Sequence, residues 1–110
     1  MAGIGIDIEK ISRFKNIGCF ERFLELVFSR EEIRDLNIAA DKYRHAASRF
    51  ALKEAVIKAA PDKLTYRDIE IHRSGEKPSV TIKSGSARSA TIMASISHDP
   101  ENAVAVAMML

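Results

Sequence analysis

The sequence contains little of what marks several specialised classes of protein. It has a single cysteine, Cys19, no tryptophan, and only 6% aromatic residues. One cysteine excludes an internal disulfide and is typical of a reducing compartment, so we expect a cytoplasmic protein. The apolar fraction of 46% and the charged fraction of 29% are ordinary for a globular protein, which argues against disorder, collagen and a coiled coil.

Long apolar runs and long basic runs are also missing. The apolar runs are far shorter than the roughly 20 residues of a membrane-spanning helix, and MAGIGIDIEK has no basic segment before an apolar one, so we expect neither a membrane partner nor a signal peptide. The net charge of +2 argues against a nucleic-acid partner. A chain of 110 residues is long enough for about one domain, which we assign to residues 1–110.

The first residues show the strict alternation of a β-strand. In GIGIDI, residues 3–8, three isoleucines lie on one face and Gly3, Gly5 and Asp7 on the other. The glycine face is almost bare, so a ligand could approach the strand backbone closely beside Asp7. Asp7 could instead end the strand as a turn former or a helix cap.

The rest of the chain divides into a helical half and a strand half. Helical patterns cover residues 9–28 with a break at 16–18, a segment from the capping box of Ser29 and Glu32 to about Ala39, and a long helix over 41–60 that Pro61 ends. Strands are predicted at 65–73, 79–85, 90–97 and 102–110, with turns at 74–78 and 98–101. We therefore predict a single α+β domain in which a long central helix packs on an antiparallel sheet.

The segment FALKEAVIKAAP, residues 50–61, is helical but has two apolar stripes. At 100° per residue, Phe50 and Ile57 lie opposite the stripe that we assign to the core. The core stripe comprises Ala51, Leu52, Ala55, Val56 and Ala59. A helix with two apolar stripes is covered on two sides, by another strand layer, a ligand or a second subunit.

Charged residues border the second stripe of this helix. Lys53 lies on one side, and Glu54 and Lys58 lie on the other. The last two have the i,i+4 spacing of a surface ion pair worth a few tenths of a kcal/mol. Arg49, Lys53 and Lys58 around one carboxylate would equally suit a phosphorylated ligand and a metal.

Asp7 and Glu54 together favour the second interpretation. One aspartate and one glutamate from distant segments make a sparse site for Mg²⁺, whose other positions water and phosphate oxygens would fill. With nearby cations, this pattern is typical of phosphoryl-type transfer. His98, at the end of the last but one strand, shares the parity of Ile92 and Ile96, which predicts partial burial and either a structural or a catalytic role.

Three of these segments together resemble the holo-acyl-carrier-protein synthases, the small group of 4'-phosphopantetheinyl transferases. GIGIDIEKISRF, with Arg13 six residues after Asp7, is similar to their opening motif. RFALKEAVIKA, with a lysine four residues after Glu54, is similar to the second, and SISH to the third. Order and spacing match over essentially the whole chain, including the strand–turn–strand DIEIHRSGEKPSVTI.

The resemblance implies a transferase that moves the 4'-phosphopantetheine arm of coenzyme A to a serine of an apo acyl carrier protein in fatty-acid biosynthesis. It implies that Asp7 and Glu54 hold Mg²⁺, or Mn²⁺ in its place, and that Lys58 stabilises the leaving phosphate. The implied coenzyme A contacts are Arg44, Arg49, Lys53, Lys58 and His98, and the implied carrier contacts are Arg13, Arg22 and Phe23. It also implies a homotrimer with active sites between subunits, which would account for the twice-covered helix.

One departure from the family keeps other functions open. The Gly-Thr-Gly loop that follows the second motif in the family is replaced by AAPDKLTY, so we expect altered nucleotide binding and weaker binding of coenzyme A. A metal-dependent phosphoesterase that uses Asp7 and Glu54 is one alternative. A non-catalytic trimeric scaffold that only binds carriers is another, and the shortened loop favours it.

Overall fold

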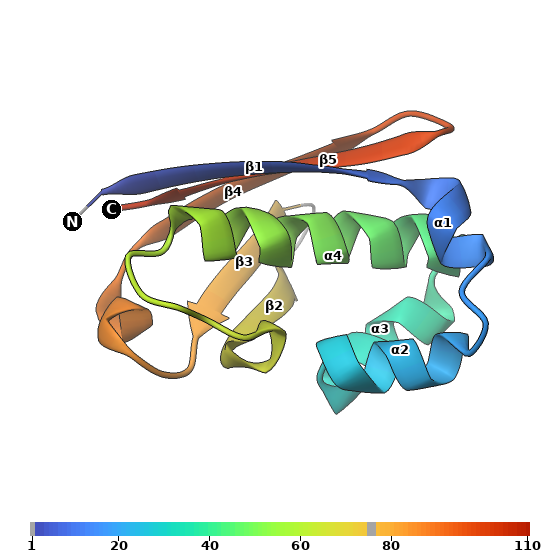
Figure 1. Ribbon diagram of the computed structural model, residues 1–110, viewed down its shortest axis with the longest axis horizontal. Helices are drawn as coiled ribbons and strands as arrows, with labels where there is room; N and C mark the ends of the chain where they lie inside the picture. Colours follow the sequence, from blue (N-terminus) through green and yellow to red (C-terminus); the bar gives the residue numbers. More distant parts are fainter. Residues whose placement is uncertain (1, 75–76) are drawn as a thin grey trace.

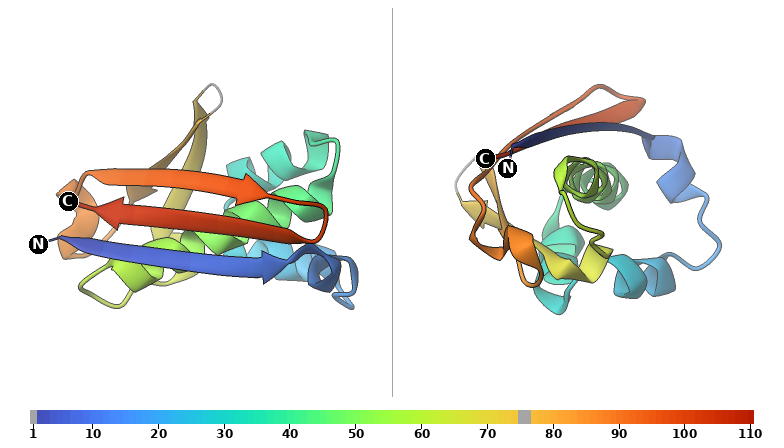
Figure 2. Two further views of the ribbon diagram at one scale, coloured as in Figure 1. Left: turned by 90° about the horizontal axis from the view of Figure 1, so that it is seen from above. Right: turned by 60° about the vertical axis from the view of Figure 1, so that its left-hand side comes forward.

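The long helix α4 (Lys42–Ala59) is the element around which the rest of the chain is arranged (Figure 1). In this computed structural model, which describes residues 2–74 and 77–110, an antiparallel sheet covers one side of α4. Its strands, in spatial order, are β1 (Gly3–Lys10), β5 (Asn102–Met109) and β4 (Ile92–His98) (Figure 2). The helices α1 (Ile11–Lys15), α2 (Phe20–Val27) and α3 (Arg30–Ile38) and the hairpin of β2 (Ile69–Ser74) and β3 (Lys77–Ile82) surround the rest of the helix.

The predicted fold class and order of elements are confirmed. Asp41 caps α4 through its bond from the Arg44 amide, and Ser29 and Glu32 form the expected capping box of α3. Several boundaries were wrong: β1 continues through residues 9 and 10, β3 covers 77–82 and not 79–85, and residues 66–68 form a 3₁₀ turn, η1 (Tyr66–Asp68), before β2. A second such turn, η2 (Ser86–Ser89), follows β3. Residues 75 and 76 of the predicted 74–78 turn lie outside the described residues. Among the described helices, none has the length and apolarity that a membrane crossing requires.

The glycine face of β1 packs against α4. A Cβ atom on Gly5 would lie 1.9 Å from the carbonyl oxygen of Ala55, and one on Gly3 would lie 2.0 Å from that of Ala59. The glycines therefore make room for the helix backbone, and the expectation that they admit a ligand was wrong. The other face of the larger sheet, here called the outer face, is turned away from α4 and is mostly apolar, apart from Ser95 and Ser97. It carries Ile4, Ile6, Ile8, Met93, Val104, Val106 and Met108.

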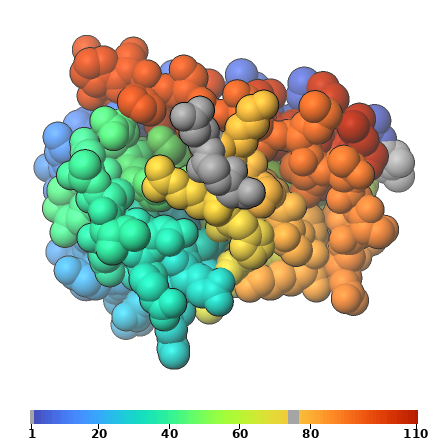
Figure 3. Space-filling view, turned by 180° about the vertical axis from the view of Figure 1, so that it is seen from behind, coloured from blue at the N-terminus to red at the C-terminus, as the bar shows by residue number. Residues whose placement is uncertain are grey.

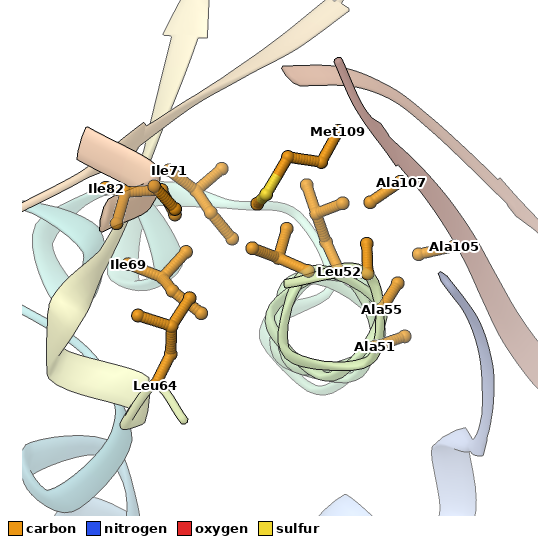
Figure 4. Packing of buried hydrophobic residues seen from close by; sticks show 13 residues of the cluster. Ala51, Leu52, Ala55, Leu64, Ile69, Ile71, Ile82, Ala105, Ala107 and Met109 are labelled. Atoms are coloured by element: carbon orange, nitrogen blue, oxygen red, sulfur yellow. The ribbon is translucent and has the colours of Figure 1, made fainter. Parts of the chain in front are cut away.

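The predicted core stripe of α4 is confirmed, since each of its five residues is at most 6% exposed. It packs on small residues of β5, including Ala105 and Ala107, and on Met109 (Figure 4). The second stripe is covered by the same chain: Phe50 contacts the rings of Phe14 and Phe23 at centroid distances of 5.8 Å. Helices α1 and α2 therefore cover Phe50, a cover that the three explanations did not include, whereas Ile57 of the same stripe is partly buried against the core cluster of α4.

Candidate active site

Asp7 and Lys58 meet at the free edge of β1. The Nζ atom of Lys58 donates to Asp7 Oδ1 at 3.2 Å and to the carbonyl oxygen of Ile6 at 2.9 Å. The Asp7 side chain is 13% exposed and that of Lys58 is 52% exposed. The strand therefore presents a nearly buried carboxylate to a lysine that can still reach solvent.

Glu54 lies one helical turn before Lys58 and has a different partner. Its Oε1 atom accepts a hydrogen bond of 2.5 Å from the hydroxyl of Tyr66, on η1. Burial, followed by the hydrogen bond and charge of Glu54, raises the pKa of Tyr66 to about 12. Within the described part of the chain, Lys58 pairs with Asp7 and not with Glu54, so the simple surface pair is not formed.

Sequence reasoning missed a third carboxylate, Glu9. It follows Asp7 by two residues on the same face of β1 and is 8% exposed. Burial, followed by the neighbouring Asp7, raises the pKa of Glu9 to about 8, although the Arg13 guanidinium 3.7 Å away opposes this shift. We call Asp7, Glu9 and Glu54 the acidic site. The period of two along the strand was a signal that could have identified Glu9.

The acidic site suits a hard divalent cation. Among the described residues, Asp7 Oδ2 is buried without a hydrogen-bond partner, and the charges of Asp7 and Glu54 both disfavour the ionised form of Glu9. In residues 2–74 and 77–110, no group of three or more histidine, cysteine, aspartate or glutamate side chains is close enough to hold a metal alone. Two carboxylates supplemented by water and ligand oxygens are nevertheless a common arrangement for Mg²⁺.

A second candidate site, the cationic pocket, is lined by residues of α4, β3 and β4. Figure 3 shows the molecule from the side on which β3 and β4 lie at the surface. It has a volume of about 460 Å³, and its lining includes Arg49, Lys77 and His98. Burial, followed by the charges of Arg49 and Arg73, lowers the pKa of the nearby His45 to about 4. This concentration of positive charge would favour a phosphorylated ligand.

Arg44 and His98 line an adjoining pocket of about 450 Å³ between α1, the start of α4 and the β4–β5 turn. His98 thus belongs to both pockets and is exposed, so its predicted partial burial was wrong. The structure places the three predicted coenzyme A residues Arg44, Arg49 and His98 in one region.

Lys53 does not belong to this region. Its side chain is 0% exposed and its Nζ atom has four acceptors inside the protein. These are Glu32 Oε1 at 2.8 Å and the carbonyl oxygens of Val27, Ile69 and Tyr66 at 2.9, 2.9 and 3.0 Å. Burial lowers the pKa of Lys53, and the bond to Glu32 opposes that shift. The expectation that Lys53 lines the coenzyme A pocket was therefore wrong, because its ammonium group joins α2, α3 and η1 to α4.

The predicted carrier contacts lie near the acidic site. Arg13, with a side chain 74% exposed, and the half-buried Phe23 line a hollow of about 180 Å³ together with Glu9. Arg22 is exposed on α2. A cationic and partly apolar surface therefore begins at the acidic site and continues toward α2.

The acidic site and the cationic pocket lie on opposite sides of the chain. Asp7 is on β1, at one edge of the larger sheet, whereas His98 is on β4, at the other edge. Helix α4 passes beneath the sheet between them (Figure 2). In the described residues, Lys58 is the predicted coenzyme A residue that lies with Asp7, whereas Arg49 and His98 line a separate pocket whose lining includes neither Asp7 nor Glu54.

Comparison with known proteins shows the family. The model of the 4'-phosphopantetheinyl transferase superfamily matches residues 3–107, which include every candidate site residue. A holo-[acyl-carrier-protein] synthase of Thermodesulfovibrio yellowstonii is 40% identical over 108 residues, which cover 94% of this chain and 93% of that protein.

Two solved structures have the same fold. The holo-(acyl-carrier-protein) synthase of Bacillus anthracis in complex with CoA (3',5'-ADP) has a TM-score of 0.84 and 28% identity, with 97% of this chain and 94% of that chain covered. The enzyme of Helicobacter pylori in complex with coenzyme A has a TM-score of 0.82 and 33% identity, with 97% and 99% covered. Together with the family match, these similarities agree with the resemblance of the three sequence motifs. The chain therefore belongs to the 4'-phosphopantetheinyl transferase superfamily.

Proposed function

We propose that this protein transfers 4'-phosphopantetheine from coenzyme A to a serine of an apo acyl carrier protein and releases adenosine 3',5'-bisphosphate. The observation that carries the proposal is the contact of Lys58 with Asp7, one helical turn from Glu54, in a chain of this superfamily. Among the described residues, the second oxygen of Asp7, Oδ2, is buried without a hydrogen-bond partner. Relatives along nearly the full length are named holo-[acyl-carrier-protein] synthases, which supports the same reaction here.

The residues of the acidic site and Lys58 would have different roles in this reaction. Asp7 and Glu54 would hold Mg²⁺, and Glu9 lies beside Asp7 on the same face of β1. When bound, Mg²⁺ would neutralise the pyrophosphate of coenzyme A and polarise the phosphoryl group under attack. The serine hydroxyl would lose its proton to water, and its Oγ would bond to the phosphorus that carries the pantetheine arm while the bridging P–O bond breaks and adenosine 3',5'-bisphosphate leaves. Lys58, whose ammonium is already at the strand edge, would stabilise the charge that develops on the leaving phosphate.

Mass spectrometry of an apo carrier incubated with the protein, coenzyme A and Mg²⁺ tests this function. The carrier should gain the mass of one phosphopantetheine group, and the gain should vanish in excess EDTA. Adenosine bisphosphate released without any gain would support the phosphoesterase, and an unchanged mixture would support the scaffold. A full gain in excess EDTA would contradict the metal role of Asp7 and Glu54.

We further propose a homotrimer in which neighbouring subunits complete each active site. Ile4, Ile6 and Ile8 are 65%, 62% and 62% exposed on the outer face, which is unusually apolar for a surface. Asp7 and Lys58 line a hollow of about 300 Å³ with Ile6, Ile8 and Val104 of that same face. A subunit packed on the outer face could therefore bring its cationic pocket to the acidic site of its neighbour.

Mixing two inactive variants tests this shared site. Glu54→Gln removes a metal ligand, and Arg49→Gln removes a charge from the cationic pocket, so each should be nearly inactive alone. In trimers co-refolded from equal amounts, about a quarter of the sites should combine an intact Glu54 with an intact Arg49 from the neighbour, and activity should return. If both residues served one site in the same chain, every site would keep a defect and the mixture would stay inactive.

The carrier is proposed to bind at Arg13, Arg22 and Phe23. Charge reversal in Arg13→Glu should raise the KM for the carrier about tenfold or more and change the KM for coenzyme A little, because it acts on an acidic partner. Arg13 is 74% exposed and lies 3.7 Å from Glu9, too far for a close ion pair, so the fold should persist. Arg34→Glu, on the exposed surface of α3, is the matched control. Equal carrier KM values for both variants would contradict the docking surface.

The cellular compartment of the protein is part of the same proposal. The free, exposed thiol of Cys19 suits a reducing compartment, which supports a cytoplasmic protein. Carrier modification of this kind serves fatty-acid biosynthesis, which is consistent with a match to a fatty acid synthase subunit alpha of Aspergillus oryzae.

A further inference from the structure

We propose that Tyr66 is a positioning residue for Glu54: its hydroxyl fixes one oxygen of the carboxylate so that the other is directed to the divalent cation. The inference rests on the proposed function, because it concerns the metal ligand of that reaction. Tyr66 belongs to neither the first, second nor third sequence motif.

Three contacts hold Tyr66 against α4. Its hydroxyl donates to Glu54 Oε1 at 2.5 Å, and its ring lies 5.3 Å from that of Phe50, one helical turn before Glu54. Its carbonyl oxygen accepts a bond of 3.0 Å from Lys53 Nζ. The adjacent residues Lys53 and Glu54 thus bind the main chain and the side chain of the same tyrosine.

The turn that carries Tyr66 is itself braced. Asp68 Oδ2 accepts bonds from the Thr65 amide at 2.8 Å and from the Thr65 hydroxyl at 2.9 Å. Asp68 Oδ1 accepts a bond of 2.8 Å from the Ser84 hydroxyl, beyond β3. Thr65 and Ser84 therefore hold the turn in place, and the turn positions the Tyr66 hydroxyl against Glu54.

This support matters because a free glutamate has several rotamers. Lys58, one turn away on the same helix, would otherwise compete for the Glu54 carboxylate, since the i,i+4 spacing allows that pair. The Tyr66 hydroxyl occupies Oε1 and leaves Oε2 available. Hydrogen bonds of this kind orient metal-ligating carboxylates, and removing one commonly lowers metal affinity about 10- to 100-fold.

The test is the affinity of the full-length protein for Mn²⁺, measured by the decrease of the free Mn²⁺ EPR signal without any substrate. Tyr66→Phe removes only the hydroxyl and keeps the ring against Phe50, so a thermal melt should change little. Its Kd for Mn²⁺ should rise about tenfold or more. In transfer assays, the Mg²⁺ concentration for half-maximal rate should rise likewise, and saturating Mg²⁺ should restore most of kcat. Tyr43→Phe is the matched control, because Tyr43 contacts the ring of Phe20 at 5.0 Å.

The double variant Glu54→Gln/Tyr66→Phe completes the experiment. If Tyr66 acts through Glu54, adding Tyr66→Phe to Glu54→Gln should not weaken Mn²⁺ binding further. A wild-type Kd for Mn²⁺ in Tyr66→Phe would overturn the proposal. Equal losses of Mn²⁺ affinity in Tyr66→Phe and Tyr43→Phe would overturn it as well. A wild-type protein that binds Mn²⁺ but modifies no carrier would contradict the proposed function and leave the assignment of Tyr66 intact.

Discussion

Glu54→Gln should lower the turnover of phosphopantetheine transfer by about 10²- to 10³-fold or more while the protein keeps its fold and its oligomeric state. Glutamine has nearly the same shape and helix propensity as glutamate. Its amide oxygen can still accept the hydrogen bond from the Tyr66 hydroxyl. The substitution therefore removes the negative charge that would hold the cation and little else.

Turnover and a thermal melt on the same preparation separate this expectation from a structural role. Glu31→Gln, in the exposed first turn of α3, is the matched control and should leave both quantities unchanged. With EDTA present, coenzyme A should bind Glu54→Gln at least as well as the wild type, because one negative charge no longer repels the pyrophosphate. Near-normal turnover would exclude Glu54 as a metal ligand. A large fall in the melting temperature would show instead that Glu54 stabilises the fold.

The periodicity of helix and strand identified the faces that carry Asp7 and Lys58, and the role of these residues in a metal site stays a prediction. A carboxylate on the glycine face of β1 and two charges one turn apart on α4 could meet only where strand and helix pack, and Asp7 and Lys58 do meet there. Glu9 was within reach of the same reasoning, since it shares the face of Asp7. Tyr66 was not, because its contact with Glu54 depends on where η1 places a residue 12 positions later in the sequence.

Two expectations failed because periodicity says which residues share a face but not what the face contacts. The glycine face of β1 was expected to admit a ligand, yet the backbone of α4 lies where only glycine fits, and the isoleucine face is the exposed one. The angle of Lys53 around α4 places it beside the second stripe, and that angle says nothing about how far a long side chain reaches. Fully buried lysines are rare, so the sequence alone favoured a solvent-exposed side chain for Lys53.

Lys53→Met should reduce the free energy of unfolding by about 3–5 kcal/mol, because removing one partner of a buried ion pair leaves the other charge without compensation. Methionine fills much of the same space, so the loss would come from Glu32 and from the carbonyl oxygens that lose their shared donor. Glu32 would keep its bonds from the Ser29 and Ile71 amides, at 2.7 and 2.8 Å, but not its counter-charge.

Lys58→Met is the matched substitution with the opposite expectation. Lys58 is 52% exposed and its pair with Asp7 is near solvent, so Lys58→Met should lower the free energy of unfolding by less than about 1 kcal/mol. The same substitution should remove most of the turnover. Denaturant unfolding of both variants at one fixed chain concentration, which holds any contribution of oligomerisation constant, measures the difference. If Lys53 bound coenzyme A, Lys53→Met would instead unfold like the wild type and raise the KM for coenzyme A. That result would return Lys53 to the active site and require another support for Tyr66.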